Sequence, residues 1–231
     1  ALTEQRTREI VAQYDKNSIW YKRDIEGQRV IAEGLIYRMF ADNPQKFLLE
    51  KAPVNLMQII VGVDFGGNGS SHTFVATGIT QNYKQVVALV SERHDAKDVT
   101  PTQLNKLFIT FLNRVIAMYG RVDITYVDSA EQTLKNGFIE AVLKAELNVP
   151  VKNAAKKEIV DRIRLTSALM STNRFSYTKD CETLIDALST AVWDPDEEQE
   201  DIRLDDGTSD IDTLDAFEYT IERFIKAFIF V

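Results

Sequence analysis

Three aspartates lie where the sequence could assemble a metal-binding cluster. Asp64 ends the apolar run 56–64, Asp128 ends the segment VDITYVD, and Asp215 lies in the first turns of the last predicted helix. Acids at the ends of neighbouring strands meet at one sheet edge, and an acid on a helix packed across that edge would join them. Such hard oxygen donors suit Mg²⁺ or Mn²⁺ rather than zinc. Two such ions could activate water and stabilise a leaving 3′-oxygen, the two-metal route to phosphodiester cleavage.

Each acid also has a simpler interpretation. An acid at a strand end is often a loop cap, and an amphipathic helix carries acids on its exposed side. The metal hypothesis therefore depends on the convergence of Asp64, Asp128 and Asp215, which spacing alone does not establish.

The glycine-rich stretch VGVDFGGNGSSHTF around Asp64 could instead bind the phosphates of a nucleotide. A Walker A loop needs a lysine that FGGNGSSH lacks, and the G-x-G-x-x-G fingerprint is not matched. The segment after the glycines also predicts a strand, whereas both phosphate motifs open a helix. The glycines are more simply explained as a tight reversal after Asp64 that leaves space for metal and DNA backbone.

The segments that carry these acids predict a mixed sheet. LMQIIVGVD is typical of a strand buried on both faces. HTFVATGITQ and KQVVALVSER follow as two more strands joined by a turn, so the three are expected to form an antiparallel meander. Later short strands are expected at 122–128, 148–154 and 174–179.

Helical periodicity separates and follows these later strands. It predicts helices at 101–120, 129–146, 156–172, 180–193 and 209–231. Thr100 is expected to cap the first of them and Asp180 the fourth. The polar stretch 194–207 is interpreted as an excursion, with a hairpin as one option. This order predicts an α/β fold whose mixed central sheet, three antiparallel strands followed by parallel strands, is flanked by helices.

Residues 1–55 differ from the rest of the chain. They predict a helix capped by Thr3, then a mixture of helical and extended signals, and then a connector with two prolines. We therefore expect a boundary near residue 55, with a helical segment or linker at 1–55 and a domain at 56–231.

Composition restricts the function further. The net charge of −8 argues against strong nucleic-acid binding, although acids are concentrated between Asp194 and Glu222, where a divalent cation could offset part of the charge. The single cysteine, Cys181, excludes an internal disulfide. No apolar run reaches the roughly 18 residues that a membrane span needs.

Several segments, in order, resemble the C-terminal nuclease domain of the large terminase subunit of tailed bacteriophages, which has a ribonuclease H-like fold. They are VGVDFGGNGSSHTFVATGI, ITYVDSAEQTLKNGFI, KKEIVDRIRLTSALMSTNRFSY, TLIDALSTAVWD and IDTLDAFEYTIE. WYKRDIEGQRVIAEGLIYRMF is similar to the junction that follows the packaging ATPase domain, so 1–55 would be the end of that domain.

The resemblance implies an endonuclease that cuts concatemeric phage DNA during packaging in the host cytoplasm. It implies metal ligation by Asp64, Asp128 and Asp215, with two Mg²⁺ or Mn²⁺ ions. The implied partners are double-stranded DNA, the terminase ATPase domain, the small terminase subunit and the portal. With a net charge of −8, the chain alone should bind DNA weakly and with strong salt dependence.

The sequence departs from the family pattern at Asp212, where many relatives carry a histidine. Asp212 lies one helical turn before Asp215, so it could be an added ligand or a solvated surface acid. His72 and His94 are softer candidates, because a lone histidine is more often structural or exposed. The densest basic cluster could contact DNA phosphates or form a solvated helix face, and consists of Lys156, Lys157, Arg162 and Arg164.

Two other functions remain open at this point. An ATPase of the actin and heat-shock-protein superfamily also begins with a strand, an aspartate and a glycine-rich turn. It needs a second glycine-rich loop, which YVDSAEQT does not provide. A non-enzymatic docking module of the packaging motor, with degenerate acids, is the second alternative.

Overall fold

The computed structural model describes residues 3–28, 34–67, 69–196 and 201–229. They form a seven-stranded sheet in the order β1-β7-β4-β3-β2-β5-β6. The strands are β1 (Leu48–Leu49), β2 (Leu56–Asp64), β3 (Ser71–Thr80), β4 (Val86–Asp95), β5 (Ile124–Val127), β6 (Val151–Asn153) and β7 (Phe175–Thr178). The helices are α1 (Glu4–Ala12), α2 (Arg38–Asp42), α3 (Pro101–Tyr119), α4 (Gln132–Lys144), α5 (Ile159–Ser171), α6 (Glu182–Thr190), α7 (Ile211–Ile221) and α8 (Ile225–Ile229).

The strand pairing confirms the predicted mixed sheet. Strands β2, β3 and β4 form the antiparallel meander, while β5 pairs parallel to β2 and β6 parallel to β5. Strand β7 pairs parallel to β4 on the other side. The carboxyl ends of β2, β4, β5, β6 and β7 therefore share one sheet edge, which is where Asp64 and Asp128 are found.

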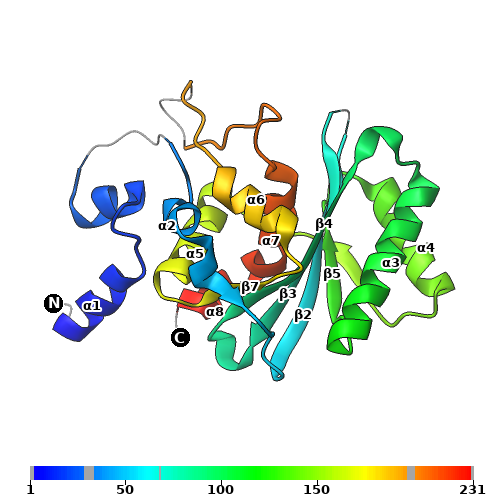
Figure 1. Ribbon diagram of the computed structural model, residues 1–231, viewed down its shortest axis with the longest axis horizontal. Coiled ribbons are helices and arrows are strands. Elements are labelled where there is room, and N and C mark those ends of the chain that lie inside the picture. Colours follow the sequence, from blue (N-terminus) through cyan, green and yellow to red (C-terminus); the bar gives the residue numbers. More distant parts are fainter. Residues whose placement is uncertain (1–2, 29–33, 68, 197–200, 230–231) are drawn as a thin grey trace.

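Helices cover both faces of the sheet (Figure 1). Helices α3 and α4 lie on one face, and α2, α5, α6 and α7 lie on the other. On the α3–α4 face, Phe74, Phe111, Phe108 and Phe138 form an aromatic core, and the rings of Phe108 and Phe138 stack 3.9 Å apart. Within the described residues, every helix is too short or too polar to cross a membrane.

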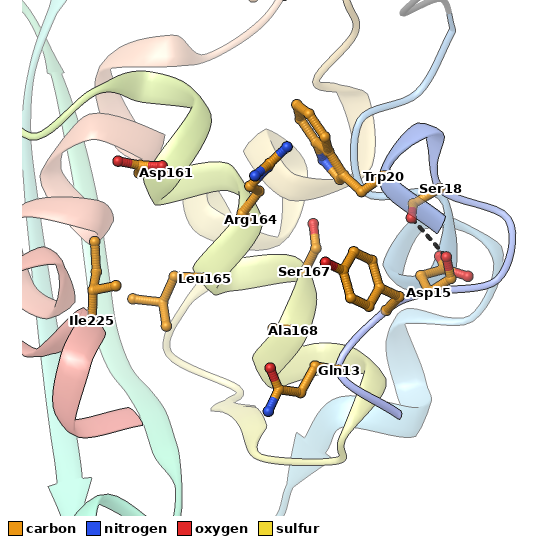
Figure 2. Close-up of a pocket in the computed structure, with 11 residues that line it drawn as sticks. Gln13, Asp15, Ser18, Trp20, Asp161, Arg164, Leu165, Ser167, Ala168 and Ile225 are labelled. Carbon is orange, nitrogen blue, oxygen red and sulfur yellow. Dashed lines mark hydrogen bonds between the residues drawn. The ribbon is translucent and has the colours of Figure 1, made fainter. Parts of the chain in front are cut away.

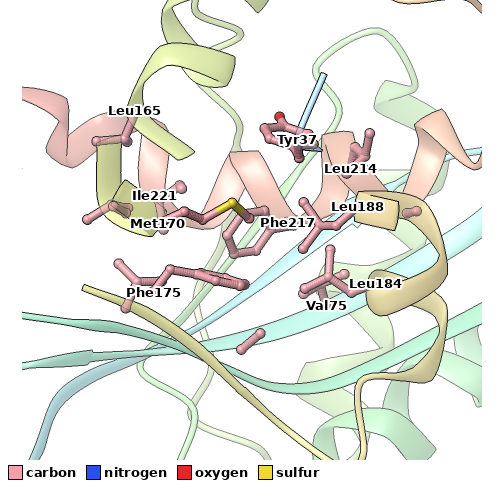
Figure 3. Close-up of a cluster of buried hydrophobic side chains, with 14 of the residues drawn as sticks. Tyr37, Val75, Leu165, Met170, Phe175, Leu184, Leu188, Leu214, Phe217 and Ile221 are labelled. Atoms are coloured by element: carbon pink, nitrogen blue, oxygen red, sulfur yellow. The ribbon is translucent and has the colours of Figure 1, made fainter. Parts of the chain in front are cut away.

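The α7 face has its own apolar core. Figure 3 shows Phe217 and Leu214 of α7 among Met170 of α5, Leu188 of α6 and Phe175 of β7. These side chains hold α7 flat against the sheet. The helix therefore presents a fixed set of residues to the carboxyl end of β2.

Helix ends follow the predicted signals with two differences. Thr100 forms a capping box with Gln103, and Thr3 caps α1. The prediction for Asp180 was wrong, because Cys181 occupies the N-cap position and the Asp180 carboxylate is drawn to Arg114, 2.8 Å away. The last predicted helix is interrupted by a 3₁₀ turn at Glu222–Phe224 between α7 and α8, and residues 230–231 lie outside the described residues.

The segment before residue 55 contributes to the same sheet and core. Strand β1 pairs parallel to β7, and Phe40 and Phe47 pack against Phe175. The boundary near residue 55 stays a prediction. Arg203 of the polar excursion forms an antiparallel bridge with Trp193, which directly precedes the excursion, while residues 197–200 lie outside the described residues.

Candidate active site

Asp64 and Asp128 lie side by side at the carboxyl edge of the sheet. Val63 and Val127 are partners in the parallel β2–β5 register, and the Asp128 amide donates to the Val63 carbonyl at 3.1 Å. Side chains alternate between faces along a strand. Val63 and Val127 therefore enter the α3–α4 core, while Asp64 and Asp128 are on the α7 side. The sheet register thus brings the two strand-end acids together.

Gly62 lets α7 approach this edge closely. A Cβ atom at Gly62 would lie 1.8 Å from the Ala216 carbonyl oxygen, so no larger residue fits unless the helix moves. Asp215 immediately precedes Ala216, and Tyr219 lies one turn after Asp215. The Tyr219 hydroxyl donates to Asp64 Oδ1 at 3.1 Å. Because glycine has no side chain, Gly62 allows α7 to bring Asp215 close to the two strand-end acids, Asp64 and Asp128.

Among the acids at this edge, Asp64 has the environment least favourable to a negative charge. It is only 8% exposed, and burial raises its pKa well above the ordinary carboxyl value. The negative charges of Asp215, Asp212 and Asp128 raise the pKa further, and the Tyr219 hydrogen bond partly opposes them. Among the described residues, no cation forms an ion pair with Asp64. A buried carboxylate in this setting attracts positive charge.

The other two acids have protein cations beside them. Lys156 Nζ lies 2.6 Å from Asp128 Oδ1. Arg162 lies 2.9 Å from Asp215 Oδ1, and Arg203 contacts the same oxygen. The second Asp215 oxygen takes no part in these two ion pairs.

Glu218 fixes the two arginines. Its side chain is fully buried, with Arg203 at 3.0 Å from Oε1 and Arg162 at 3.1 Å from Oε2. The Tyr37 hydroxyl also donates to Oε1, at 3.1 Å. Burial disfavours the Arg203 charge, but Glu218 and Asp215 outweigh that effect and raise the pKa of Arg203. Asp215 is therefore held by cations that are themselves held in place.

These acids lie near one another, but their side chains are not arranged as a complete metal-coordination site. In the described part of the chain, no group of three or more His, Cys, Asp or Glu side chains is already arranged as metal ligands. Asp64, Asp128 and Asp215 nevertheless supply only hard oxygen donors, and Asp64 is the one that pairs with no cation among the described residues. Their chemistry fits a small divalent cation such as Mg²⁺ or Mn²⁺.

Asp212 mainly fastens α7 to β3. Its Oδ2 accepts the Ser71 amide at 2.7 Å, and its carbonyl accepts the Thr73 hydroxyl at 2.8 Å. Burial raises the pKa of Asp212, and the Ser71 hydrogen bond opposes that shift. Asp212 is thus half-buried and structurally engaged, and it adds negative charge beside Asp64.

Of the two histidines, His72 supports the glycine-rich turn. His72 is buried, and its Nδ1 accepts the Gly66 amide at 3.1 Å. Burial, and then the nearby His94, lower the pKa of His72, which favours the neutral imidazole that accepts this hydrogen bond. His94 faces Glu92 at 3.4 Å. Residue 68 of the turn lies outside the described residues.

The four basic candidates do not form one surface. Lys156 and Lys157 are exposed near the acidic edge, whereas Arg162 is 5% exposed and paired with Asp215 and Glu218. Its burial removes Arg162 from any exposed phosphate-binding face.

Arg164 points to the other side of α5. Its guanidinium lies 4.1 Å from the centre of the Trp20 ring and 3.6 Å from Asp24. It lines a cavity of about 250 Å³ between residues 13–20 and α5 (Figure 2). Asp64, Asp128, Asp212 and Asp215 do not line this cavity. Arg164 therefore belongs to the contact with the N-terminal segment.

The sequence interpretation missed four residues of the site. Glu218 and Tyr219 follow Asp215 by three and four residues, the spacing of one helix face, and could have been flagged. Arg203 contacts Asp215, and the Glu222 carboxylate accepts the backbone amides of residues 155–157, which include Lys156, the partner of Asp128. Neither residue carried such a signal, because these partners are distant in sequence.

The comparisons with known proteins support this fold. No protein-family model and no curated protein matches the chain. The large terminase of a thermophilic bacteriophage is similar over 97% of this chain and 52% of its own, with 21% identity and a TM-score of 0.77. The P22 large terminase nuclease domain matches 84% of this chain and 95% of its own, with 14% identity and a TM-score of 0.63.

A third structure extends the comparison. The large terminase nuclease of thermophilic phage G20c, solved with bound magnesium, matches 84% of this chain and 99% of its own, with 13% identity and a TM-score of 0.52. At these identities the similarity shows the fold, so this chain has the ribonuclease H-like fold of large terminase nuclease domains. The chain spans about half the length of the first of these three proteins, the large terminase that matches 97% of it.

Proposed function

We propose that this chain is the nuclease part of a viral packaging terminase, a divalent-metal-dependent endonuclease that cuts concatemeric DNA. The observation that carries the proposal is Asp64, a buried carboxylate that lies beside three further acids at the edge of a terminase-nuclease fold and pairs with no cation in the described part of the chain. Among the described residues, such an arrangement is the one best suited to hold metal ions for phosphodiester hydrolysis.

Asp64, Asp128 and Asp215 would hold two Mg²⁺ or Mn²⁺ ions. Magnesium bound to the G20c nuclease, which shares the fold, supports this choice. Bound between these carboxylates, the ions would lower the pKa of the attacking water and stabilise the leaving 3′-oxygen. Asp212 would add negative charge to the site while it fastens α7. Crystals soaked in Mn²⁺ would show whether Asp212 is also a ligand.

The chain's own residues would keep this site in a fixed geometry. Arg162 and Arg203 hold one oxygen of Asp215 and leave the other for ligation. Burial raises the pKa of Tyr219, so its hydroxyl keeps the proton that it donates to Asp64. Preorganised ligands of this kind avoid reorganisation during the reaction.

The longer protein would supply what this chain lacks. We propose that residues 1–55 are the end of a packaging ATPase domain even though their β1 joins the sheet described above, with the small terminase subunit and the portal as partners in the host cytoplasm. The net charge of −8 makes DNA binding by the chain alone weak, so its partners would raise the local DNA concentration.

Cleavage of supercoiled plasmid tests the proposal. We expect the plasmid to be nicked and linearised with Mn²⁺ or Mg²⁺, with little sequence preference. EDTA should abolish this cleavage. Asp64→Asn should reduce the rate by about 100-fold or more, the scale of lost metal-assisted catalysis. Glu140→Gln, on the exposed side of α4, is the matched control and should cleave like wild type.

The alternatives predict other results. Tight, magnesium-dependent ATP binding by calorimetry, with no nicking, would favour the actin-type ATPase. A wild-type protein that never nicks DNA with Mn²⁺, and is unchanged by Asp64→Asn and Asp128→Asn, would favour the docking module.

A further inference from the structure

The Glu222 side chain binds the backbone amides of the loop at residues 155–157, beside the active site. The side chain is fully buried just after α7, and its carboxylate accepts three consecutive amides. Ala155 and Lys156 donate to Oε1 at 2.7 and 2.9 Å, and Lys157 donates to Oε2 at 2.8 Å. Hydrogen bonds to a carboxylate are among the stronger ones in proteins, so this loop has a fixed position.

Lys156 connects this loop to the active site, because its backbone binds Glu222 and its side chain contacts Asp128. Its backbone is left-handed, with φ of 50°, a conformation that a lysine rarely adopts unless its surroundings impose it. This turn lets the three amides converge on Glu222 while the Lys156 side chain reaches Asp128, at 2.6 Å. Glu222 and Asp128 are thus joined through one residue.

The three cationic side chains beside Asp128 and Asp215 differ in how easily they can move away from these carboxylates. Arg162 and Arg203 have side chains only 5% and 2% exposed, and Glu218 anchors both. The Lys156 side chain is 42% exposed and pairs with Asp128. A long, exposed lysine side chain can swing into solvent, whereas the buried arginines cannot.

We infer that Lys156 is the exchangeable counterion of this site and that Glu222 is its positioning residue. The inference rests on the proposed function. The Lys156 ammonium neutralises Asp128 in the metal-free protein, a divalent ion takes its place, and the released ammonium then contacts a DNA phosphate from the same loop. Glu222 keeps the loop within reach for both arrangements.

Mn²⁺ binding to the DNA-free protein, measured by calorimetry, tests the exchange separately from catalysis. Lys156→Met removes the competitor, so we expect about fivefold tighter Mn²⁺ binding, the scale of a partly exposed ion pair. Plasmid cleavage by the same variant should fall, because the phosphate contact is lost. The control for metal affinity is Lys157→Met, at the adjacent exposed lysine, which forms no ion pair with Asp64, Asp128 or Asp215 among the residues that the structure describes. It should change Mn²⁺ affinity less than about twofold, within the scatter of surface substitutions.

Glu222→Gln tests the positioning role. It keeps the side-chain volume but presents an amide donor to one backbone N–H, so the loop should loosen. If the variant folds, Mn²⁺ should again bind more tightly while cleavage falls, and Lys156→Met should add little in the double variant. If it does not fold, Lys156→Met decides alone.

Two failures are distinguishable. Unchanged or weaker Mn²⁺ binding by Lys156→Met, in a protein that cleaves DNA, would overturn the counterion role and leave the proposed function standing. A wild type that binds Mn²⁺ but never cleaves would overturn the proposed function, whereas tighter Mn²⁺ binding by Lys156→Met would still support the exchange.

Discussion

On the α3–α4 face of the sheet, the core consists of apolar and aromatic side chains with the neutral polar His72 beside Phe65, whereas the α7 face also buries the charged Arg162, Arg203, Glu218 and Glu222. Apolar burial alone would stabilise either face. Buried charges instead cost desolvation free energy and are weak evidence for stability. On the α7 face, however, each of them contacts a candidate catalytic acid or a residue that touches one. The difference indicates that one face serves mainly folding and the other maintains a preorganised site.

Removal of Arg203 should give the largest effect. Arg203→Met leaves Glu218 and Asp215 with one arginine instead of two, and loss of one partner in a buried ionic network costs about 3–5 kcal/mol. Chemical denaturation should show this loss, and cleavage should fall as well because Asp215 loses a contact. Arg203→Lys, which keeps the charge, should lose less. A fully stable and active Arg203→Met variant would show that the network is not needed.

The aromatic face should respond in stability alone. Phe111 is fully buried, so Phe111→Ala should reduce the free energy of unfolding by about 3–4 kcal/mol through lost burial and a cavity. The cleavage rate per folded molecule should stay at the wild-type value. Met118→Ala, an exposed apolar residue on the same helix, is the control and should change stability little. A large rate loss in folded Phe111→Ala would erase the contrast between the faces.

The close approach at Gly62 should give an intermediate effect on both properties. In Gly62→Ala the new methyl group meets the Ala216 carbonyl, so α7 must shift, at a cost of roughly 1–3 kcal/mol. Cleavage should fall because Asp215 moves away from Asp64. Gly67→Ala, where a Cβ meets nothing within 4 Å, is the control for stability. Equal behaviour of the two variants would argue against the role of Gly62.

The smallest effect should be the pH dependence caused by Asp64. Its folded-state pKa is raised by burial, so the native protein holds this proton at pH values where the unfolded chain has lost it. Stability from this group is therefore present below the unfolded pKa and declines as pH rises through the folded pKa. Asp64→Asn should remove that decline, so its melting temperature relative to wild type should increase from about pH 4 to about pH 7, the range above the ordinary carboxyl pKa. A constant difference across that range would contradict the raised pKa.

Much of this architecture could be predicted from the sequence because it depends on local periodicity. The strand at 56–64 and the helix cap at Thr100 are each predicted by only a few neighbouring residues. The neighbouring positions of Asp64 and Asp128 followed from strand ends. The metal-ligand role of the three acids stays a prediction.

The electrostatic detail could not be predicted in the same way. A backbone bridge to Trp193 positions Arg203, whose side chain contacts Asp215 directly, and Glu222 accepts the amides of residues 155–157 across the fold. Such pairs have no fixed spacing, because they depend on how α7 packs against the sheet. Arg162 looked like part of an exposed basic helix for the same reason, although the fold buries it.

Anomalous scattering from crystals soaked in Mn²⁺ tests the central claim most directly. The account predicts manganese peaks in direct contact with carboxylate oxygens of Asp64, Asp128 and Asp215, and loss of those peaks in Asp64→Asn crystals. Peaks confined to other acids, or no peak at this edge in a protein saturated with Mn²⁺ in solution, would contradict it.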